Sequence, residues 1–209
     1  MKKISKISLI QEIIKLNIFR ITNTTDKNKW ILLKNGSRAP IFLDTSIFIS
    51  YPLLLEKINK YIIQTIKEEE IKFDKIMGLP YGGIPFAYGV INILKVPALA
   101  LRKEGKKNYS TKGDLLGEFK RGDRVLLIED AIVTANTAIG FIERIKKDNL
   151  VVQDIISIVD IGGDGGKNLK NAGVKLHSLF TWKEFFDVYK SINPKKSNNV
   201  YKLIDGILS

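Results

Sequence analysis

The chain has 209 residues and no cysteine, so its composition excludes a disulfide framework, a thiolate nucleophile and cysteine-bound zinc. Its length suits one globular domain with a substantial core, and no apolar run approaches the roughly 20 residues that a membrane span requires. The net charge of +12 comes from 28 lysines and only six arginines, scattered along the chain; because base-reading surfaces favour arginine, we expect a solvated lysine-rich surface, no nucleic-acid or membrane partner and a cytoplasmic location.

The first 70 residues predict two helices with short strands between them. Apolar residues at helical spacing predict an amphipathic helix over 6–19 and a second one over 52–69. Between them, apolar runs flank the turn Lys34-Asn35-Gly36-Ser37, and Asn-Gly between apolar runs is a hairpin signal. We therefore expect short paired strands within 30–49.

From residue 75 the pattern alternates between strands and helices. Such alternation predicts a mostly parallel sheet that is flanked by helices on both faces. A polar, glycine-containing segment over 105–120 is long enough to be a mobile functional loop. The expected strands are 75–80, 96–101, 124–129, 154–161 and 174–180, and the expected helices are 83–94, 134–147, 167–171 and 182–191.

Glycine-rich or charged residues follow directly after three of these predicted strands. In open α/β sheets, ligands bind beyond the carboxyl ends of the strands. Here those ends carry Tyr81-Gly82-Gly83, the basic stretch from Arg102 to Lys107, and the acidic pair Glu129-Asp130. We therefore expect the functional site at this edge of the sheet.

The acidic pair belongs to the most informative string, which runs from Val125 to Ala138. Four apolar residues predict a buried strand, two carboxyls end it, and a turn with Thr134, Asn136 and Thr137 opens a helix. Adjacent acids need a cation or hydroxyl groups to offset their repulsion. A helix N-terminus binds anions. Together they suit a sugar phosphate, although Asp130 or Thr134 alone could serve as a helix cap.

This string resembles the signature of the type I phosphoribosyltransferases, which hold 5-phosphoribosyl 1-diphosphate (PRPP). The resemblance covers roughly residues 30–190 and narrows to the orotate phosphoribosyltransferases, notably the transferase domain of eukaryotic UMP synthase. Five segments are similar to that family in the right order: Leu33–Asp44, Gly78–Pro85, Arg102–Lys106, the acidic string and Gly173–Leu179.

The resemblance implies an α/β protein with the type I phosphoribosyltransferase fold. That fold has a central, mostly parallel sheet flanked by helices, a small N-terminal hood and a flexible catalytic loop. We expect one domain over 1–209. Within it, 1–50 form the N-terminal helix and hood, 51–192 the α/β core and 193–209 a C-terminal tail.

The resemblance also assigns roles to individual residues. Lys106 and Asp130 are the expected catalytic residues, and Lys106 would stabilise the departing diphosphate. The base would lie against Lys34, Phe42, Leu43 and Thr134. The residues expected to bind PRPP are Lys34, Tyr81, Arg102, Lys103, Lys106, Glu129, Asp130, Thr134, Ala135, Asn136 and Thr137.

The implied activity is Mg²⁺-dependent transfer of phosphoribosyl from PRPP to orotate, which gives orotidine 5′-monophosphate and diphosphate. Magnesium would be held mainly through PRPP, with no direct protein ligand. The resemblance further implies a homodimer with loop residues shared across the interface, and a separate orotidine-monophosphate decarboxylase as partner.

Three positions depart from the family pattern. The glycine of the phosphate turn is replaced by Ala135 or Asn136, and Asn136 would preserve a left-handed turn best. Ile161 stands where the family has the arginine that pairs with the orotate carboxylate, and Asn108 stands where it has His or Tyr. Two alternatives therefore remain: a transferase for another nucleobase, and a PRPP-binding regulator without catalysis.

Two other features predict structural roles. His177 is the single histidine and lies in an apolar strand, so we expect a structural residue with a hydrogen-bond partner. Trp182, Phe185 and Phe186 are expected in the core under the last predicted helix.

Overall fold

A four-stranded parallel sheet forms the centre of the computed structural model, which describes residues 3–32, 38–102, 115–194 and 198–208. The strand order is β10-β9-β8-β5. The bounds are Lys75–Gly78 for β5, Val125–Ile132 for β8, Asp154–Asp160 for β9 and Lys175–Thr181 for β10. Strands of a parallel sheet are covered on both faces and so consist of nearly continuous apolar residues, which explains the long apolar runs in this part of the sequence.

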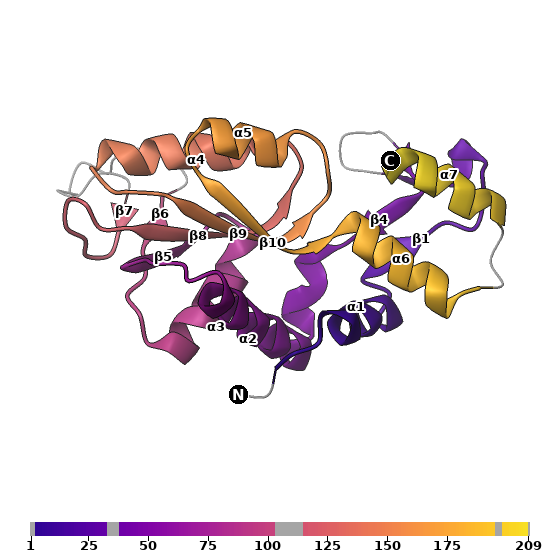
Figure 1. Cartoon of the computed structure of the whole chain (residues 1–209), viewed down its shortest axis with the longest axis horizontal. Helices are drawn as coiled ribbons and strands as arrows, with labels where there is room; N and C mark the ends of the chain where they lie inside the picture. The colour runs from indigo at the N-terminus through magenta and orange to yellow at the C-terminus, as the bar shows by residue number, and fades with distance from the viewer. Residues whose placement is uncertain (1–2, 33–37, 103–114, 195–197, 209) are drawn as a thin grey trace.

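Helices cover both faces of the sheet (Figure 1). α2 (Pro52–Glu68) and α3 (Gly83–Leu94) lie on one face, and α4 (Asn136–Lys147) and α5 (Gly165–Asn171) lie on the other. The buried apolar residues accordingly form two clusters, one on each side: Ile62, Val90 and Ile156 belong to the first, and Leu127, Ile142 and Ile155 belong to the second. The predicted fold class, a parallel sheet between two helical layers, is confirmed.

A smaller unit beside the sheet joins the two ends of the chain (Figure 1). We call it the hood, and we include in it Thr22, which follows β1, and residues 44–50, which follow β4. It contains α1 (Lys6–Lys15), the antiparallel pair β1 (Phe19–Ile21) and β4 (Ile41–Leu43), α6 (Trp182–Ile192) and α7 (Asn198–Leu208). Phe19 stacks on Phe185 with ring centroids 5.1 Å apart, so N-terminal and C-terminal elements share one core.

The remaining elements are short. They are the 3₁₀ helices η1 (Lys27–Lys29) and η2 (Thr45–Ser50), the antiparallel pair β2 (Ile31–Leu32) and β3 (Arg38–Ala39), and the antiparallel pair β6 (Ala100–Leu101) and β7 (Leu115–Leu116). The turn at Asn35-Gly36 lies outside the described residues, as do 103–114 of the predicted loop.

Several predicted elements differ in extent from the structure. The first helix ends at Lys15 and not at residue 19, because Asn17 takes a left-handed conformation (φ +57°) and the chain then enters β1. The predicted strand 96–101 reduces to β6, with a single bridge from Ala98 to β5. The predicted tail over 193–209 contains the helix α7, whose Val200, Tyr201 and Ile204 are buried against the hood.

The close approach of α3 to β8 requires a glycine. A Cβ atom on Gly83 would lie 2.0 Å from the carbonyl oxygen of Ile128, far inside van der Waals contact. The backbone N–H of Leu79 donates to that same carbonyl at 2.9 Å. This packing sets the beginning of α3 directly beside the acidic pair.

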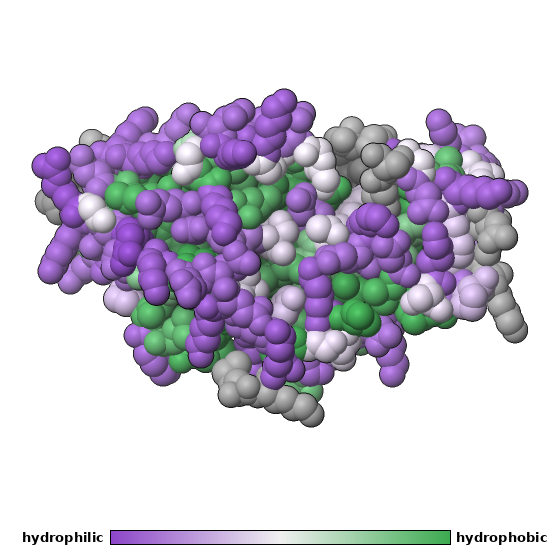
Figure 2. Space-filling view, viewed as in Figure 1, coloured by the Kyte–Doolittle hydropathy of each residue, from purple (hydrophilic) through white to green (hydrophobic). Residues whose placement is uncertain are grey.

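Hydrophilic side chains cover most of the face seen in Figure 2, as the lysine-rich composition predicts, and apolar residues show mainly between the helices. Within the described part of the chain, no helix is long and apolar enough to cross a membrane.

Candidate active site

The acidic pair lies on the most central part of the sheet, in β8. Sequence reasoning ended this strand at Glu129, but β8 continues to Ile132 because Ala131 and Ile132 keep their pairing with Val159 and Asp160 of β9. Glu129 and Asp130 are therefore held in regular strand geometry and do not belong to a loop. Glu129 pairs with Ser157 of β9, and the pairing continues at Ala131, so β9 fixes the backbone of both acids.

The surroundings of Glu129 favour its protonated form. Burial, the hydrogen bond with Asp130 and the negative charge of Asp130 together raise the pKa of Glu129 to about 9. The backbone N–H of Asp130 also donates to Glu129 Oε1 at 3.3 Å. The raised pKa favours the neutral carboxylic acid form of Glu129 at pH 7.

A cavity of about 710 Å³ opens in front of this pair, between the hood and the core. The hood contributes Phe42, Leu43 and Thr45 to its wall, and the core contributes Tyr81 and Asp130. Four of these five are residue positions that the sequence assigned to PRPP or to the base. The hood and the carboxyl end of the sheet thus enclose one site.

Asp130 is held on two sides within this cavity. Thr45 Oγ1 in η2 donates a hydrogen bond of 2.5 Å to Asp130 Oδ2. On the other side the carboxylate lies against Gly82, where a Cβ atom would be 2.1 Å from Asp130 Cγ. Sequence reasoning missed Thr45, since a contact across 85 residues leaves no local signal.

A second cavity of about 270 Å³ adjoins the first at the turn between β8 and α4. It is lined by Glu129 and by residues 131–138, which include the predicted phosphate-binding residues Thr134, Ala135, Asn136 and Thr137. The first N–H groups of a helix have no intrahelical acceptor. The N-terminus of α4 therefore presents donors here, as an anion site requires.

The left-handed residue of this turn is Ala135 (φ +61°), and the prediction that favoured Asn136 is wrong. Asn136 is already the first residue of α4. Because α4 begins at Asn136, the left-handed position falls on the preceding residue, Ala135, although asparagine adopts this conformation more readily than alanine. Two contacts from the α5 segment hold the turn: Asn168 Nδ2 donates to the carbonyl oxygen of Thr134 at 3.0 Å, and Gly165 N–H donates to that of Val133 at 2.9 Å.

The cationic part of the predicted site is only partly described. Lys34, Lys103 and Lys106 lie outside the described residues. Arg102 is half-buried at the end of β6, and its Nε atom is buried with no hydrogen-bond partner among the described residues. Arg144 of α4 donates to the carbonyl oxygen of Arg102 at 3.0 Å, a contact that sequence reasoning did not anticipate.

The residues assigned to the base lie in the hood strand β4. Leu43 is buried and Phe42 is half-buried, and both line the larger cavity. The guanidinium of Arg20, opposite Phe42 on β1, lies 5.4 Å from the centroid of the Phe42 ring. Tyr81 stands at the rim of the cavity and is 69% exposed.

Ile161 packs against the larger apolar cluster, and its backbone N–H donates to the carbonyl oxygen of Ile132 at 2.9 Å. A side chain with this role supplies packing and no positive charge. The departure from the family arginine is therefore accommodated by the core.

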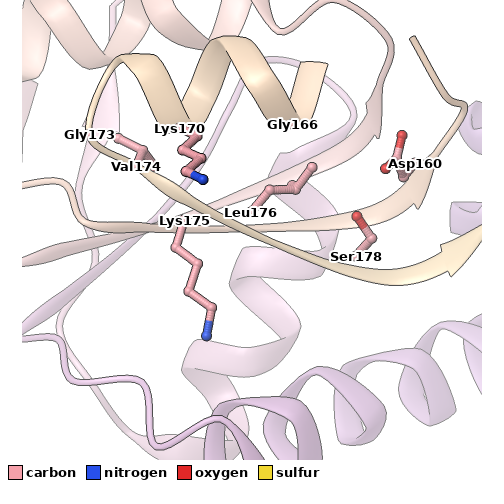
Figure 3. Close-up of a pocket in the computed structure, with 8 residues that line it drawn as sticks. All are labelled: Asp160, Gly166, Lys170, Gly173, Val174, Lys175, Leu176 and Ser178. Atoms are coloured by element: carbon pink, nitrogen blue, oxygen red, sulfur yellow. The ribbon is translucent and has the colours of Figure 1, made fainter. Parts of the chain in front are cut away.

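A further hollow of about 660 Å³ lies between α5 and the edge strand β10 (Figure 3). Its lining includes Lys170 and Ser178, with Asp160 at one end and Lys175 pointing to the opposite side of the strand. The ammonium of Lys175 is paired with Glu69 at 2.9 Å. None of the predicted site residues lines this hollow, so we do not assign the site to it.

The residues predicted to be structural are confirmed as such. His177 is buried, and its Nε2 lies 2.7 Å from Asp154 Oδ1. Phe185 and Phe186 are fully buried in the hood core, and Trp182 packs against it.

Comparison with known proteins assigns the chain to a family. The family model of the phosphoribosyl transferase domain matches residues 47–191. The chain therefore belongs to the phosphoribosyl transferase family.

Within that family, the similar sequences include proteins with two names, orotate phosphoribosyltransferase and uridine 5′-monophosphate synthase. An orotate phosphoribosyltransferase of Archaeoglobus fulgidus is 30% identical over 79% of this chain and 87% of its own length. A uridine 5′-monophosphate synthase of Caenorhabditis elegans is 32% identical over 83% of this chain, which spans only 34% of that relative. The solved UMP synthase of Leishmania donovani has the same fold, with a TM-score of 0.78, 24% identity and coverage of 97% of this chain and 42% of its own.

The neutral state of Glu129 predicts how stability depends on pH. The pKa of Glu129 is about 9 in the folded protein and near its ordinary value of 4.5 when unfolded. The unfolded state therefore loses this proton first, and the stabilising contribution present below pH 4.5 falls as the pH rises toward 9. Glu129→Gln removes this titration. The free energy of unfolding of the variant minus that of the wild type should therefore increase from pH 5 to pH 9.

Urea unfolding at pH 5, 7 and 9 measures this difference. Glu143→Gln, which changes an exposed carboxyl on α4, should follow the wild-type profile. A constant gap between Glu129→Gln and the wild type at all three values would contradict a neutral Glu129.

The left-handed Ala135 predicts a contrast between two alanine positions. An L-residue in this conformation costs about 1–2 kcal/mol that glycine does not. Ala135→Gly should therefore leave the free energy of unfolding unchanged or higher, because relief of this cost offsets the loss of a methyl group. Ala138→Gly, in the first turn of α4 and also buried, should lose about 1–2 kcal/mol. Equal losses in urea unfolding would show that Ala135 is not strained.

Proposed function

We propose that the chain catalyses Mg²⁺-dependent transfer of the phosphoribosyl group from PRPP to orotate, giving orotidine 5′-monophosphate and diphosphate. The observation that carries the proposal is the arrangement on β8 and α4: an acidic pair faces a cavity, and a helix N-terminus opens beside it. The names of the relatives supply the base.

The proposal gives each end of PRPP its own part of the site. Asp130 accepts hydrogen bonds from the ribose hydroxyls, and the neutral Glu129 offers both a donor and an acceptor. The backbone N–H groups and the hydroxyls of Thr134 and Thr137 hold the 5′-phosphate. Arg102 and Tyr81 approach the diphosphate from the other side, with Lys103 and Lys106 as expected further cations.

Catalysis on this proposal rests on positioning and on stabilisation of charge. Cleavage of the bond between the ribose C1 and the diphosphate leaves positive charge on the sugar, and Asp130 is the nearby anion. The cationic side chains stabilise the negative charge that departs with the diphosphate. The cavity under the hood holds the base on the open face of the sugar.

Magnesium fits this site through the substrate. Asp130 offers one anionic carboxylate and Glu129 is neutral, which is a poor ligand set for Mg²⁺ without the oxygens of the diphosphate. When bound to the diphosphate, Mg²⁺ neutralises charge on the leaving group. Asp130 and Glu129 would hold the ribose beside it.

The apolar packing of Ile161 favours one alternative, transfer to a nucleobase without a carboxylate. A charge-assisted hydrogen bond to a carboxylate contributes about 1.5–3 kcal/mol. Orotate binding therefore depends on other cations near the base, and Lys34 is the one that the sequence places there.

Release of diphosphate from PRPP and Mg²⁺ tests the proposal directly. We expect release with orotate and none with uracil, hypoxanthine or no base. Asp130→Asn should raise the PRPP KM about tenfold or more, because a charged acceptor for the ribose is lost. Release with another base would overturn the assignment to orotate. PRPP binding, seen as a shift in Tm, without release under any condition would favour a regulator.

The product suggests the partner. Orotidine 5′-monophosphate becomes UMP by loss of its carboxylate, and the chain spans about a third of the UMP synthases that it matches. A decarboxylase, fused or separate, is therefore the proposed neighbour in the same pathway.

We also propose a homodimer formed through the rim of the larger cavity. Large apolar side chains are exposed there: Leu32 (62%), Ile49 (61%) and Tyr81 (69%) line the cavity, and Leu53 (73%) follows at the start of α2. Exposed apolar residues gathered at one place indicate an interaction surface. A partner at this rim would lie close enough to contribute to the site.

Sedimentation of two charge variants tests this surface. Leu53→Glu should shift the protein toward the monomer, because a charge would be buried in the interface. Ile7→Glu is the matched control, since Ile7 is also exposed (59%) but lies on α1. A dimer that survives Leu53→Glu, or a wild-type monomer, would contradict the proposed interface.

A further inference from the structure

We propose that Thr45 is a positioning residue for the ribose-binding carboxylate, through the hydrogen bond that its hydroxyl donates to Asp130 Oδ2. The inference rests on the proposed function and adds to it a residue from the hood. Thr45 would hold the Asp130 carboxylate in the orientation that accepts a substrate hydroxyl. The hood would thereby control the geometry of an anion on the central sheet.

The donor and acceptor roles follow from the chemistry of the two groups. An ionised carboxylate only accepts hydrogen bonds, so the Thr45 hydroxyl is the donor. The separation of 2.5 Å is typical of an O–H group that donates to a charged oxygen. Both residues line the larger cavity, so the bond lies in the wall that faces the substrate.

Two further groups border the Asp130 carboxylate. Gly82 lies against the carboxylate group on the side of the β5–α3 turn, with room for no Cβ atom. The neutral Glu129 is hydrogen-bonded to Asp130 from the same strand. Thr45 is the contact that comes from outside the core. A carboxylate has about four acceptor sites, so these two hydrogen bonds leave capacity for the ribose hydroxyls.

The change in PRPP affinity when the Thr45 hydroxyl is removed distinguishes two roles: orienting the Asp130 carboxylate, and competing with the ribose hydroxyls for it. The Thr45 hydroxyl occupies an acceptor site that a ribose hydroxyl could otherwise use. If it merely filled that site in the free protein, its removal would tighten PRPP binding. If it orients the carboxylate, its removal weakens PRPP binding, because the freed carboxylate must lose rotational freedom when the substrate binds.

The experiment compares Thr45→Val, which keeps the shape and removes the hydroxyl, with Thr45→Ser, which keeps the hydroxyl. The matched control is Thr22→Val, because Thr22 also lies in the hood and its hydroxyl donates to the carbonyl oxygen of Pro40 at 3.2 Å. The readouts are the Kd of PRPP with Mg²⁺ by calorimetry, kcat and KM for PRPP, and Tm.

We expect Thr45→Val to weaken PRPP binding about tenfold, the size of one hydrogen bond to a charged group. Thr45→Ser should stay near the wild type, and Thr22→Val should leave the Kd unchanged. In the Asp130→Asn background, Thr45→Val should have little further effect, because the two residues act as one unit.

Three results would overturn the inference. Unchanged or tighter PRPP binding by Thr45→Val would exclude positioning, and a fall in Tm with unchanged Kd would assign the bond to stability alone. Equal losses in Thr45→Val and Thr45→Ser would show that the hydroxyl is not the group that matters. Failure of the wild-type protein to bind PRPP would overturn the proposed function itself, and is thus distinguished from the other results.

Discussion

Two neighbouring carboxyls lie on one central strand, and the structure around β8 is arranged about this pair. Burial and the neighbouring Asp130 raise the pKa of Glu129, and Asp130 lies in the cavity wall. The glycines at 82 and 83 allow the β5–α3 turn to approach both the carboxylate and the backbone of β8. A side chain at position 82 would displace the Asp130 carboxylate from its position. The sheet, the turn and α3 thus depend on the same pair.

The hood completes a site that the sheet alone leaves open on one side. Its strand β4 provides apolar walls for a planar ring, and its 3₁₀ helix η2 reaches the acidic pair. The hood is itself assembled from both ends of the chain, through contacts such as Phe19 with Phe185. Residues near the C-terminus therefore support the geometry of the base site without touching it.

Local pattern was sufficient to predict the parallel sheet, its covering helices and the edge that holds the site. Local pattern failed where contacts between residues far apart in the sequence determine the local structure. β8 continues past the acids because β9 pairs with Ala131 and Ile132, although two charges normally break a buried strand. The left-handed turn falls on Ala135 despite the preference of Asn136, since α4 begins one residue earlier than that preference requires. Thr45 and Asn168 reach the site across long sequence separations, and only the folded chain brings them there.

Helix α4 links two parts of the site that the chain reaches separately. It begins at the turn assigned to the 5′-phosphate, and two turns later Arg144 holds the carbonyl of Arg102, assigned to the diphosphate. At 1.5 Å per residue, the eight steps from Asn136 to Arg144 span about 12 Å. In the proposed function, α4 therefore fixes the separation between the residues assigned to the 5′-phosphate and Arg102, assigned to the diphosphate. A change in the length of α4 would alter this separation without altering any of the residues assigned to the ligand.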